Sequence, residues 1–128
     1  MTKVTPLHVG VGARRGVSPD EVMGLIERAL AEAGADADAI AALATVDVKA
    51  DEPGLRAAAL RLGVPLTAYG ADALAAQPVP HPSEAARRAT GAPGVAEAAA
   101  LLSAGSGGVL LVGKRKSARA TCAIACTV

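Results

Sequence analysis

The 128-residue sequence predicts an α/β fold: one three-layer α/β/α domain over residues 1–128, built on a mixed, mostly parallel five-stranded sheet. Short apolar runs alternate with segments in which apolar residues recur every three to four positions, as in strands alternating with helices. Such alternation implies right-handed crossovers and a parallel sheet covered on both faces. Only a polar turn separates the last two apolar runs, which predicts a C-terminal β-hairpin and makes the sheet mixed.

The first strand and the first helix carry clear local signals. Residues 7–11 are typical of a strand, and a helix is predicted from Pro19 to about residue 33. Ser18 is a favourable N-cap, and Glu21, three residues later, completes a capping box. Gly34 ends the helix, because glycine readily adopts the left-handed conformation of a helix C-cap.

The middle of the chain repeats this alternation. A strand is predicted at 42–46, followed by a helix that runs to Leu62 and is closed by Gly63. Further elements are predicted as a strand at 64–69, a short helix at 70–76, an extended proline-rich connector at 77–82, a short helix at 83–90 and a helix at 94–102.

The C-terminal part predicts two strands and a cationic turn. Residues 109–112 form a strand that is too apolar for a sheet edge, residues 113–119 form the turn, and residues 120–128 return antiparallel. No acidic residue follows Glu97, so residues 98–128 carry an uncompensated formal charge of +4. If the 109–112 strand runs parallel to the first strand, this charge focuses at one edge of the sheet.

Composition excludes several classes of protein. The net charge is +1, and Tyr69 is the only aromatic residue, so nucleic-acid binding by base stacking is disfavoured. No apolar segment approaches the length that spans a bilayer and no signal peptide is evident, so we expect a cytoplasmic protein without membrane contact. Cys122 and Cys126 would lie about 13 Å apart along one strand, too far for a disulfide. No metal site or cofactor is predicted, because His8 and His81 lack a spacing that would pair them.

The turn after the first strand is a candidate anion site. Gly12 and Gly16 permit close approaches and unusual backbone angles, and the helix that follows directs free N–H groups outward. Arg14 and Arg15 add forked donors that suit carboxylates or phosphates. The alternative is an ordinary strand-to-helix turn with two solvated arginines.

A second charged stretch, Asp47 to Glu52, follows the next predicted strand. Asp51 or Glu52 could simply cap the following helix, whereas Asp47 and Lys49 are explained less well that way. In parallel sheets ligands bind beyond the carboxyl ends of the strands. We therefore expect this stretch, the two arginines and Tyr69 to meet at one edge and bind a small polyanion. If the 109–112 strand is parallel to the others, Lys114, Arg115, Lys116 and Arg119 join that edge. The alternative is a lysine-rich hairpin kept hydrated to discourage edge pairing.

Four motifs together resemble the CobE/CbiG C-terminal domain family. They are Gly10-x-Gly12-x-Arg14-Arg15-Gly16, Thr45-x-Asp47-x-Lys49-x-x-Glu52-x-Gly54-Leu55, Val95-Ala96-Glu97-Ala98-Ala99-Ala100, and a lysine-bearing turn followed by Thr121-x-Ala123-Ile124-Ala125. The resemblance implies a role in cobalamin biosynthesis. Longer members are cobalt-precorrin-5A hydrolases, which open a δ-lactone and release acetaldehyde. This sequence lacks their additional N-terminal region and resembles the free-standing form of the aerobic route.

Three functional hypotheses follow. The first is a carrier or chaperone that binds a polycarboxylate corrin or precorrin intermediate, with other enzymes of the pathway as further partners. Its substrate-binding residues would be Gly12, Arg14, Arg15, Gly16, Tyr69, Lys114, Lys116 and Thr121. The second is a hydrolase in which Asp47 or Glu52 is the general base and Lys49 stabilises charge. The third is a nucleotide-binding domain, although its glycine spacing is one residue off the dinucleotide fingerprint.

Overall fold

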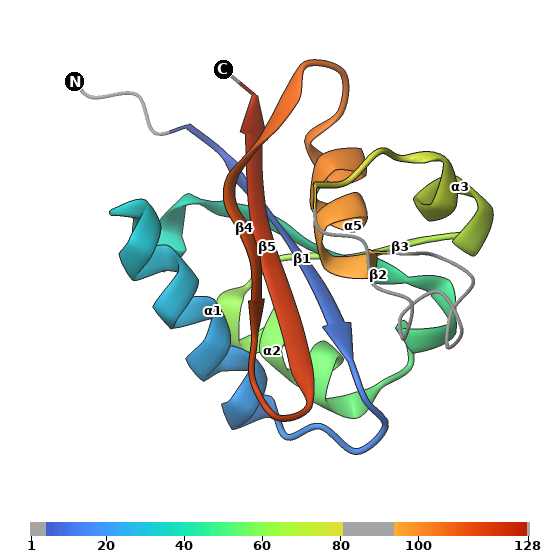
Figure 1. The fold of residues 1–128 in the computed structure, drawn as a ribbon. Helices are drawn as coiled ribbons and strands as arrows, with labels where there is room; N and C mark the ends of the chain where they lie inside the picture. The colour runs from blue at the N-terminus through green and yellow to red at the C-terminus, as the bar shows by residue number, and fades with distance from the viewer. Residues whose placement is uncertain (1–4, 81–93, 128) are drawn as a thin grey trace.

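A sheet with the strand order β3-β2-β1-β5-β4 forms the middle layer of the molecule (Figure 1). The structure is a computed structural model that describes residues 5–80 and 94–127. Within these ranges the strands are β1 (Leu7–Ala13), β2 (Ile40–Val46), β3 (Leu66–Tyr69), β4 (Gly108–Lys116) and β5 (Ala120–Thr127). β1, β2 and β3 are parallel, whereas β5 is antiparallel to both β1 and β4. The predicted mixed sheet with a C-terminal hairpin is therefore confirmed.

Helices cover both faces of this sheet. The described helices are α1 (Pro19–Ala33), α2 (Pro53–Leu62), α3 (Ala71–Ala76) and α5 (Val95–Ala104), with short 3-10 turns η1 (Ala37–Ala39) and η2 (Asp47–Lys49). α1 and α2 share one apolar cluster with the sheet, and α3 and α5 share another on the opposite face. The helix predicted at 83–90 lies outside the described residues. No helix in the described part of the chain is long and apolar enough to cross a membrane.

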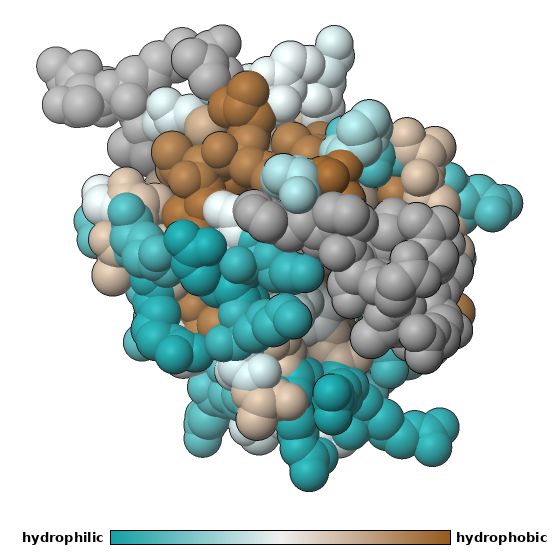
Figure 2. Space-filling view, viewed as in Figure 1, coloured by the Kyte–Doolittle hydropathy of each residue, from teal (hydrophilic) through white to brown (hydrophobic). Residues whose placement is uncertain are grey.

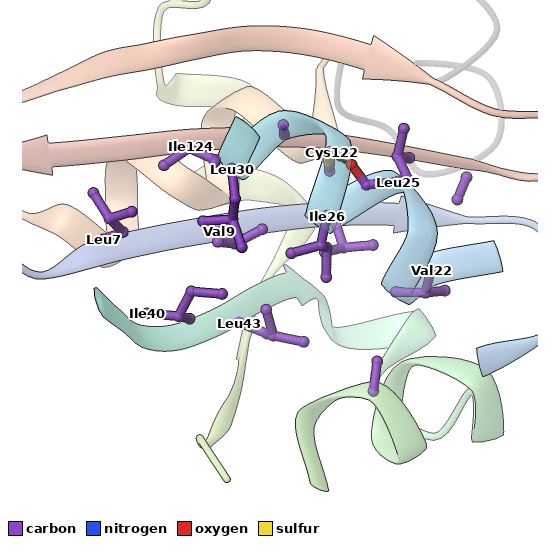
Figure 3. Close-up of a cluster of buried hydrophobic side chains, with 14 of the residues drawn as sticks. Leu7, Val9, Val22, Leu25, Ile26, Leu30, Ile40, Leu43, Cys122 and Ile124 are labelled. Carbon is purple, nitrogen blue, oxygen red and sulfur yellow. Dashed lines mark hydrogen bonds between the residues drawn. The ribbon is translucent and has the colours of Figure 1, made fainter. Parts of the chain in front are cut away.

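The caps of α1 form as predicted at Ser18 and Gly34, but the predicted capping box is only half formed, because the Glu21 carboxylate accepts from Ser117 and Arg119 of the hairpin turn. The Ser18 hydroxyl accepts a hydrogen bond from the Glu21 N–H at 3.0 Å, and Gly34 ends the helix in the left-handed conformation (φ 66°). Ile26 and Leu30 of α1 point toward Val9 of β1 and its neighbours in the buried cluster of Figure 3. Each such side chain contributes about 1.5–3 kcal/mol when it leaves water, so this face supplies much of the core.

The opposite layer depends on small residues. Gly10 lies inside β1, and a Cβ built there would stand 2.6 Å from the backbone nitrogen of Ala100 and closer still to the carbonyl oxygen of Ala96. The backbone of α5 therefore rests directly on β1. Ala123 and Ala125 of β5 continue this close packing. The alanine-rich composition thus reflects how near α5 approaches the sheet.

The prediction that residues 109–112 are too apolar for an edge is wrong, because β4 is an edge strand. β5 pairs with β1, which places the first strand of the hairpin at the outside. Val109 and Leu111 remain 44% and 48% exposed. Figure 2 shows an apolar patch over the upper half of the β4–β5 hairpin. The pairing with β5 is irregular on either side of Val112, and such bulges blunt an edge.

The cationic turn is also shorter than predicted. Lys114, Arg115 and Lys116 belong to β4, and the turn proper spans residues 117–119. The backbone N–H of Ser117 donates to the carbonyl oxygen of Ala120 at 2.9 Å and closes the hairpin. Because β-strand side chains alternate between faces, this longer strand directs its basic residues to opposite sides of the sheet.

Candidate functional site

The carboxyl ends of the parallel strands and the turn of the β4–β5 hairpin lie at the same edge of the sheet. In Figure 1 the loop after β1, the hairpin turn and the start of α2 lie together at the lower side of the view. The register fixes this arrangement, because Ala13 at the end of β1 pairs with Ala120 at the start of β5. Residues distant in sequence therefore surround one edge, where ligands of parallel sheets bind.

One lateral row of residues crosses the sheet at this edge. Tyr69 of β3 pairs with Val46 of β2. Gly10 of β1 pairs with Ala44 of β2, and the same parallel register continued by two residues places Gly12 beside Val46. Gly12 pairs with Thr121 of β5, and Thr121 pairs with Lys116 of β4. Paired residues in a sheet present their side chains to the same face. Four of the predicted substrate-binding residues, Tyr69, Gly12, Thr121 and Lys116, thus occupy one row on the α5 side.

Gly12 allows a neighbouring side chain to lie over the middle of this row. A Cβ there would stand 2.7 Å from Thr121 Oγ1 and 3.7 Å from Val95 Cβ. The Thr121 side chain therefore lies over Gly12 beside the first residue of α5. The N-cap of α5, Gly94, has no side-chain capping bond. The first turn of α5, whose N–H groups carry a partial positive charge, therefore begins beside Gly12.

The turn after β1 is held by neighbouring loops through its backbone. The Arg14 N–H donates to the Arg119 carbonyl oxygen at 2.8 Å, and the Gly16 N–H donates to Glu52 Oε1 at 2.8 Å. Gly16 has φ +82°, a conformation that favours glycine. The side chains of Arg14 and Arg15 are exposed, and neither forms an ion pair with any other residue that the structure describes. Their guanidinium groups are available to an anion.

The acidic and lysine stretch borders the same turn. Asp47 is exposed at the end of β2, and its Oδ2 lies 3.8 Å from the Cβ position of Gly70, next to Tyr69. Lys49 is half-buried in η2, and its carbonyl oxygen accepts the Glu52 N–H at 3.0 Å. Glu52 occupies the N-cap position of α2 but forms no side-chain capping bond there. Its carboxylate instead joins the β2–α2 loop to the Gly16 turn.

The basic residues of the hairpin have different positions. Arg115 lies on the α1 side, where its guanidinium binds the Glu32 carboxylate at 2.9 Å. Hydrogen bonds from Arg115 lower the pKa of Glu32, and the same bonds raise the pKa of Arg115. The Lys114 N–H donates to Oε2 of the fully buried Glu97 at 2.9 Å. Arg115 is thus directed away from the row that ends at Lys116.

Glu21 is a site residue that sequence reasoning assigned to helix capping alone, and it lies beside Arg119 of the predicted basic turn. Nη1 of Arg119 lies 3.8 Å from the Cβ position of Gly16. Oε2 of Glu21 accepts hydrogen bonds from the Ser117 hydroxyl and from the Arg119 N–H, the latter at 2.6 Å. The Ser117 hydroxyl and then the Arg119 N–H hold the pKa of Glu21 below its ordinary value of 4.5. The capping-box pattern concealed this contact, because it predicts that the glutamate turns back to its own helix.

The histidine and the two cysteines of the described ranges do not belong to this row. His8 Nδ1 is 2.7 Å from Ser103 Oγ, as expected of a histidine satisfied within the fold. Partial burial lowers the pKa of His8. Cys122 and Cys126 are free and buried, and burial raises the pKa of Cys122 to about 12. In the described ranges, no three His, Cys, Asp or Glu side chains are grouped so as to hold a metal ion.

Comparison with known proteins places this chain among proteins of cobalamin biosynthesis. The family model described as cobalamin synthesis G C-terminus matches residues 7–125. Protein CobE of Sinorhizobium sp is 43% identical over 121 residues, which cover 93% of this chain and 79% of that protein. The cobalt-precorrin-5A hydrolase of Priestia megaterium is 36% identical over 119 residues, but the match covers only 32% of its length. A crystal structure of CobE from the cobalamin pathway superposes with a TM-score of 0.92 at 38% identity, covering 100% of this chain and 98% of that one.

Proposed function

This chain belongs to the cobalamin synthesis G C-terminus family, and on that premise we propose that it binds a polycarboxylate corrin or precorrin intermediate as a carrier or chaperone. The relatives support the pathway, because one is named CobE and another cobalt-precorrin-5A hydrolase. The geometry of the carboxyl edge supports the chemical class of the ligand.

The observation that carries the proposal is the row from Tyr69 through Gly12 and Thr121 to Lys116, bordered by the Arg14 turn. A corrin precursor combines an extended apolar ring with many peripheral carboxylates. The row has an aromatic ring at one end, the Thr121 hydroxyl over Gly12 in the middle and an ammonium group at the other end. Such a surface offers apolar contact to a flat ring and places its carboxylates near cations.

The cationic side chains around the row suit carboxylates, because they have matching donor groups and are not engaged in ion pairs with other described residues. Arg14 and Arg15 present forked donors that match carboxylate geometry, and Lys116 adds a point charge. All three side chains are exposed. Within residues 5–80 and 94–127 none of them is engaged by an acidic side chain, so binding would not require breaking an ion pair. The exposed position predicts strong dependence on ionic strength.

A hydrolase is the second candidate, and the position of Asp47 favours it. Asp47 is exposed beside Gly70, at the Tyr69 end of the row, so it could act as general base on a water that attacks a bound lactone. Lys49 would then stabilise the developing oxyanion. Glu52 is less available for this role, because its carboxylate already accepts the Gly16 N–H. The relative named cobalt-precorrin-5A hydrolase supports this reaction class.

Spectral titration tests the binding proposal. Hydrogenobyrinic acid should bind with a change in its corrin absorption, whereas NADPH should leave the protein unchanged. Arg14→Ala should weaken corrin binding roughly fivefold at low salt, because it removes one exposed charge-assisted contact. Arg28→Ala removes an exposed cation from α1 and is the matched control. Equal affinities of the wild type and Arg14→Ala at every salt concentration would contradict the proposed site.

A conversion assay separates the two candidates. Asp47→Asn should abolish turnover of a precorrin lactone, measured as acetaldehyde release, while sparing binding. Glu52→Gln retains an oxygen that can accept the Gly16 N–H, so it isolates loss of the charge. Binding without acetaldehyde release by the wild-type protein would assign it the carrier role.

A further inference from the structure

We propose that Glu21 is a positioning residue that holds the Arg119 guanidinium over the Gly16 turn, where Arg119 serves as an additional carboxylate-binding residue. The Arg119 part of this inference rests on the proposed function. The positioning part rests on backbone geometry and can be tested without a ligand.

The hairpin turn is attached to the rest of the molecule through both backbone polar groups of one residue, Arg119. The Arg119 N–H donates to Glu21 Oε2 at 2.6 Å, and the Arg119 carbonyl oxygen accepts from the Arg14 N–H at 2.8 Å. The Ser117 hydroxyl donates to the same carboxylate oxygen of Glu21. These contacts determine where the turn lies relative to the loop after β1.

The direction of the Arg119 side chain follows from this attachment. Its Nη1 stands 3.8 Å from the Cβ position of Gly16, so the guanidinium covers the turn that carries Arg14 and Arg15. A residue with a side chain at 16 would contact this group, whereas glycine leaves it room. Gly16 is fixed in turn by Glu52. Two carboxylates, Glu21 and Glu52, therefore hold the basic turns through main-chain N–H groups.

The positioning role of Glu21 predicts the opposite change in affinity from a purely electrostatic role. If Glu21 were only a negative charge near the site, its removal would strengthen the binding of a polyanion. If it positions Arg119, its removal should weaken binding, because the guanidinium is no longer held where the ligand meets it. The sign of the change in Kd thus distinguishes the two roles.

The test compares Glu21→Ala with Glu27→Gln, which removes an exposed negative charge from the same helix. In Glu21→Ala, amide exchange of Arg119 should accelerate at least roughly tenfold by NMR, since its N–H loses a charged acceptor. The Kd for hydrogenobyrinic acid should rise several-fold, and Glu27→Gln should change neither value. Ser117→Ala keeps the Glu21 carboxylate and its bond to Arg119, so its effect on the Kd should be smaller. If Glu21→Ala does not fold, Ser117→Ala takes its place as the test variant.

A double-mutant cycle tests whether Glu21 acts through Arg119. In an Arg119→Ala background, Glu21→Ala should produce no further loss of affinity, because the group that it positions is already absent. Unchanged exchange at Arg119 in Glu21→Ala would overturn the positioning claim. Faster exchange with an equal or lower Kd would overturn the role of Arg119 in binding. Failure of the wild type to bind any corrinoid would refute the proposed function. The amide-exchange rate of Arg119 in Glu21→Ala would still test whether Glu21 positions Arg119.

Discussion

Substitution of Gly10 by alanine should destabilise this protein strongly although it adds only one methyl group. The new Cβ would stand 2.6 Å from Ala100 N and 2.9 Å from Ala96 C, and closer still to Ala96 O. All three atoms belong to the backbone of α5, so no side-chain rotation can relieve the overlap. α5 would have to move away from β1 and from the small residues of β5 that pack beneath it.

The expected cost follows from this geometry. Overpacked cores lose about 1–3 kcal/mol, and a helix backbone that must move belongs at the upper end of that range. Alanine recovers roughly 0.5–1 kcal/mol by restricting the unfolded chain. We therefore expect the free energy of unfolding to fall by about 2 kcal/mol. With a urea m-value of about 1.5 kcal/mol/M, the urea concentration at the unfolding midpoint should fall by about 1.3 M.

Gly24→Ala is the matched control for this experiment. Gly24 is exposed on α1, and a Cβ there meets no atom within 4 Å. The same chemical change should stabilise the protein by about 0.5–1 kcal/mol, because alanine is the better helix former. Urea unfolding, monitored by circular dichroism, measures the stability of both variants. A Gly10→Ala midpoint equal to or above that of the wild type would refute the direct contact between α5 and β1.

Three further predictions concern the site and its surroundings. Gly12→Ala should weaken corrinoid binding more than it destabilises the fold, because its Cβ would meet the Thr121 hydroxyl oxygen, which lies at the end of a side chain. The pKa values of Glu21 and Glu32 are lowered in the folded protein, so the stability that they contribute is present above pH 4.5 and is lost as the pH falls below it. Urea midpoints from pH 7 to pH 3 should therefore decline, and Glu21→Gln should flatten the decline. Because Cys122 is buried with a pKa raised to about 12, a thiol reagent at pH 8 should label it only after unfolding.

The elements that could be predicted from sequence are those with local signals. The Ser18 cap and the left-handed glycines Gly34 and Gly63 act within a few residues, and α1 and α2 end where these glycines predict. The edge position of β4 could not be read from residues 109–112, because apolarity reports burial of a face and not the number of strand neighbours. Where β4 lies depends on β5 pairing with β1, a contact between distant parts of the chain.

At the site, too, some residues could be recognised from local sequence, whereas others depend on contacts between distant parts of the chain. The basic residues and the Asp47–Glu52 stretch were visible as charges next to predicted strand ends. The register that aligns Tyr69 with Thr121 requires the whole sheet, so it had no local signal. Arg115 is predicted at the same edge as the other basic residues of the hairpin, but strand alternation directs it to Glu32 on the other face. Glu21 carried a signal for helix capping, and its contact with the hairpin depends on tertiary structure.

Hydrogen-exchange footprinting with bound corrinoid tests the central claim most directly. The claim is that the turn after β1, the loop after β2 and the hairpin meet around one polycarboxylate ligand. Saturation with hydrogenobyrinic acid should protect backbone amides in 12–17, 47–52 and 114–121 together, while the exposed face of α2 stays unchanged. Protection of only one of these segments, or protection centred on α2 and β3, would contradict it.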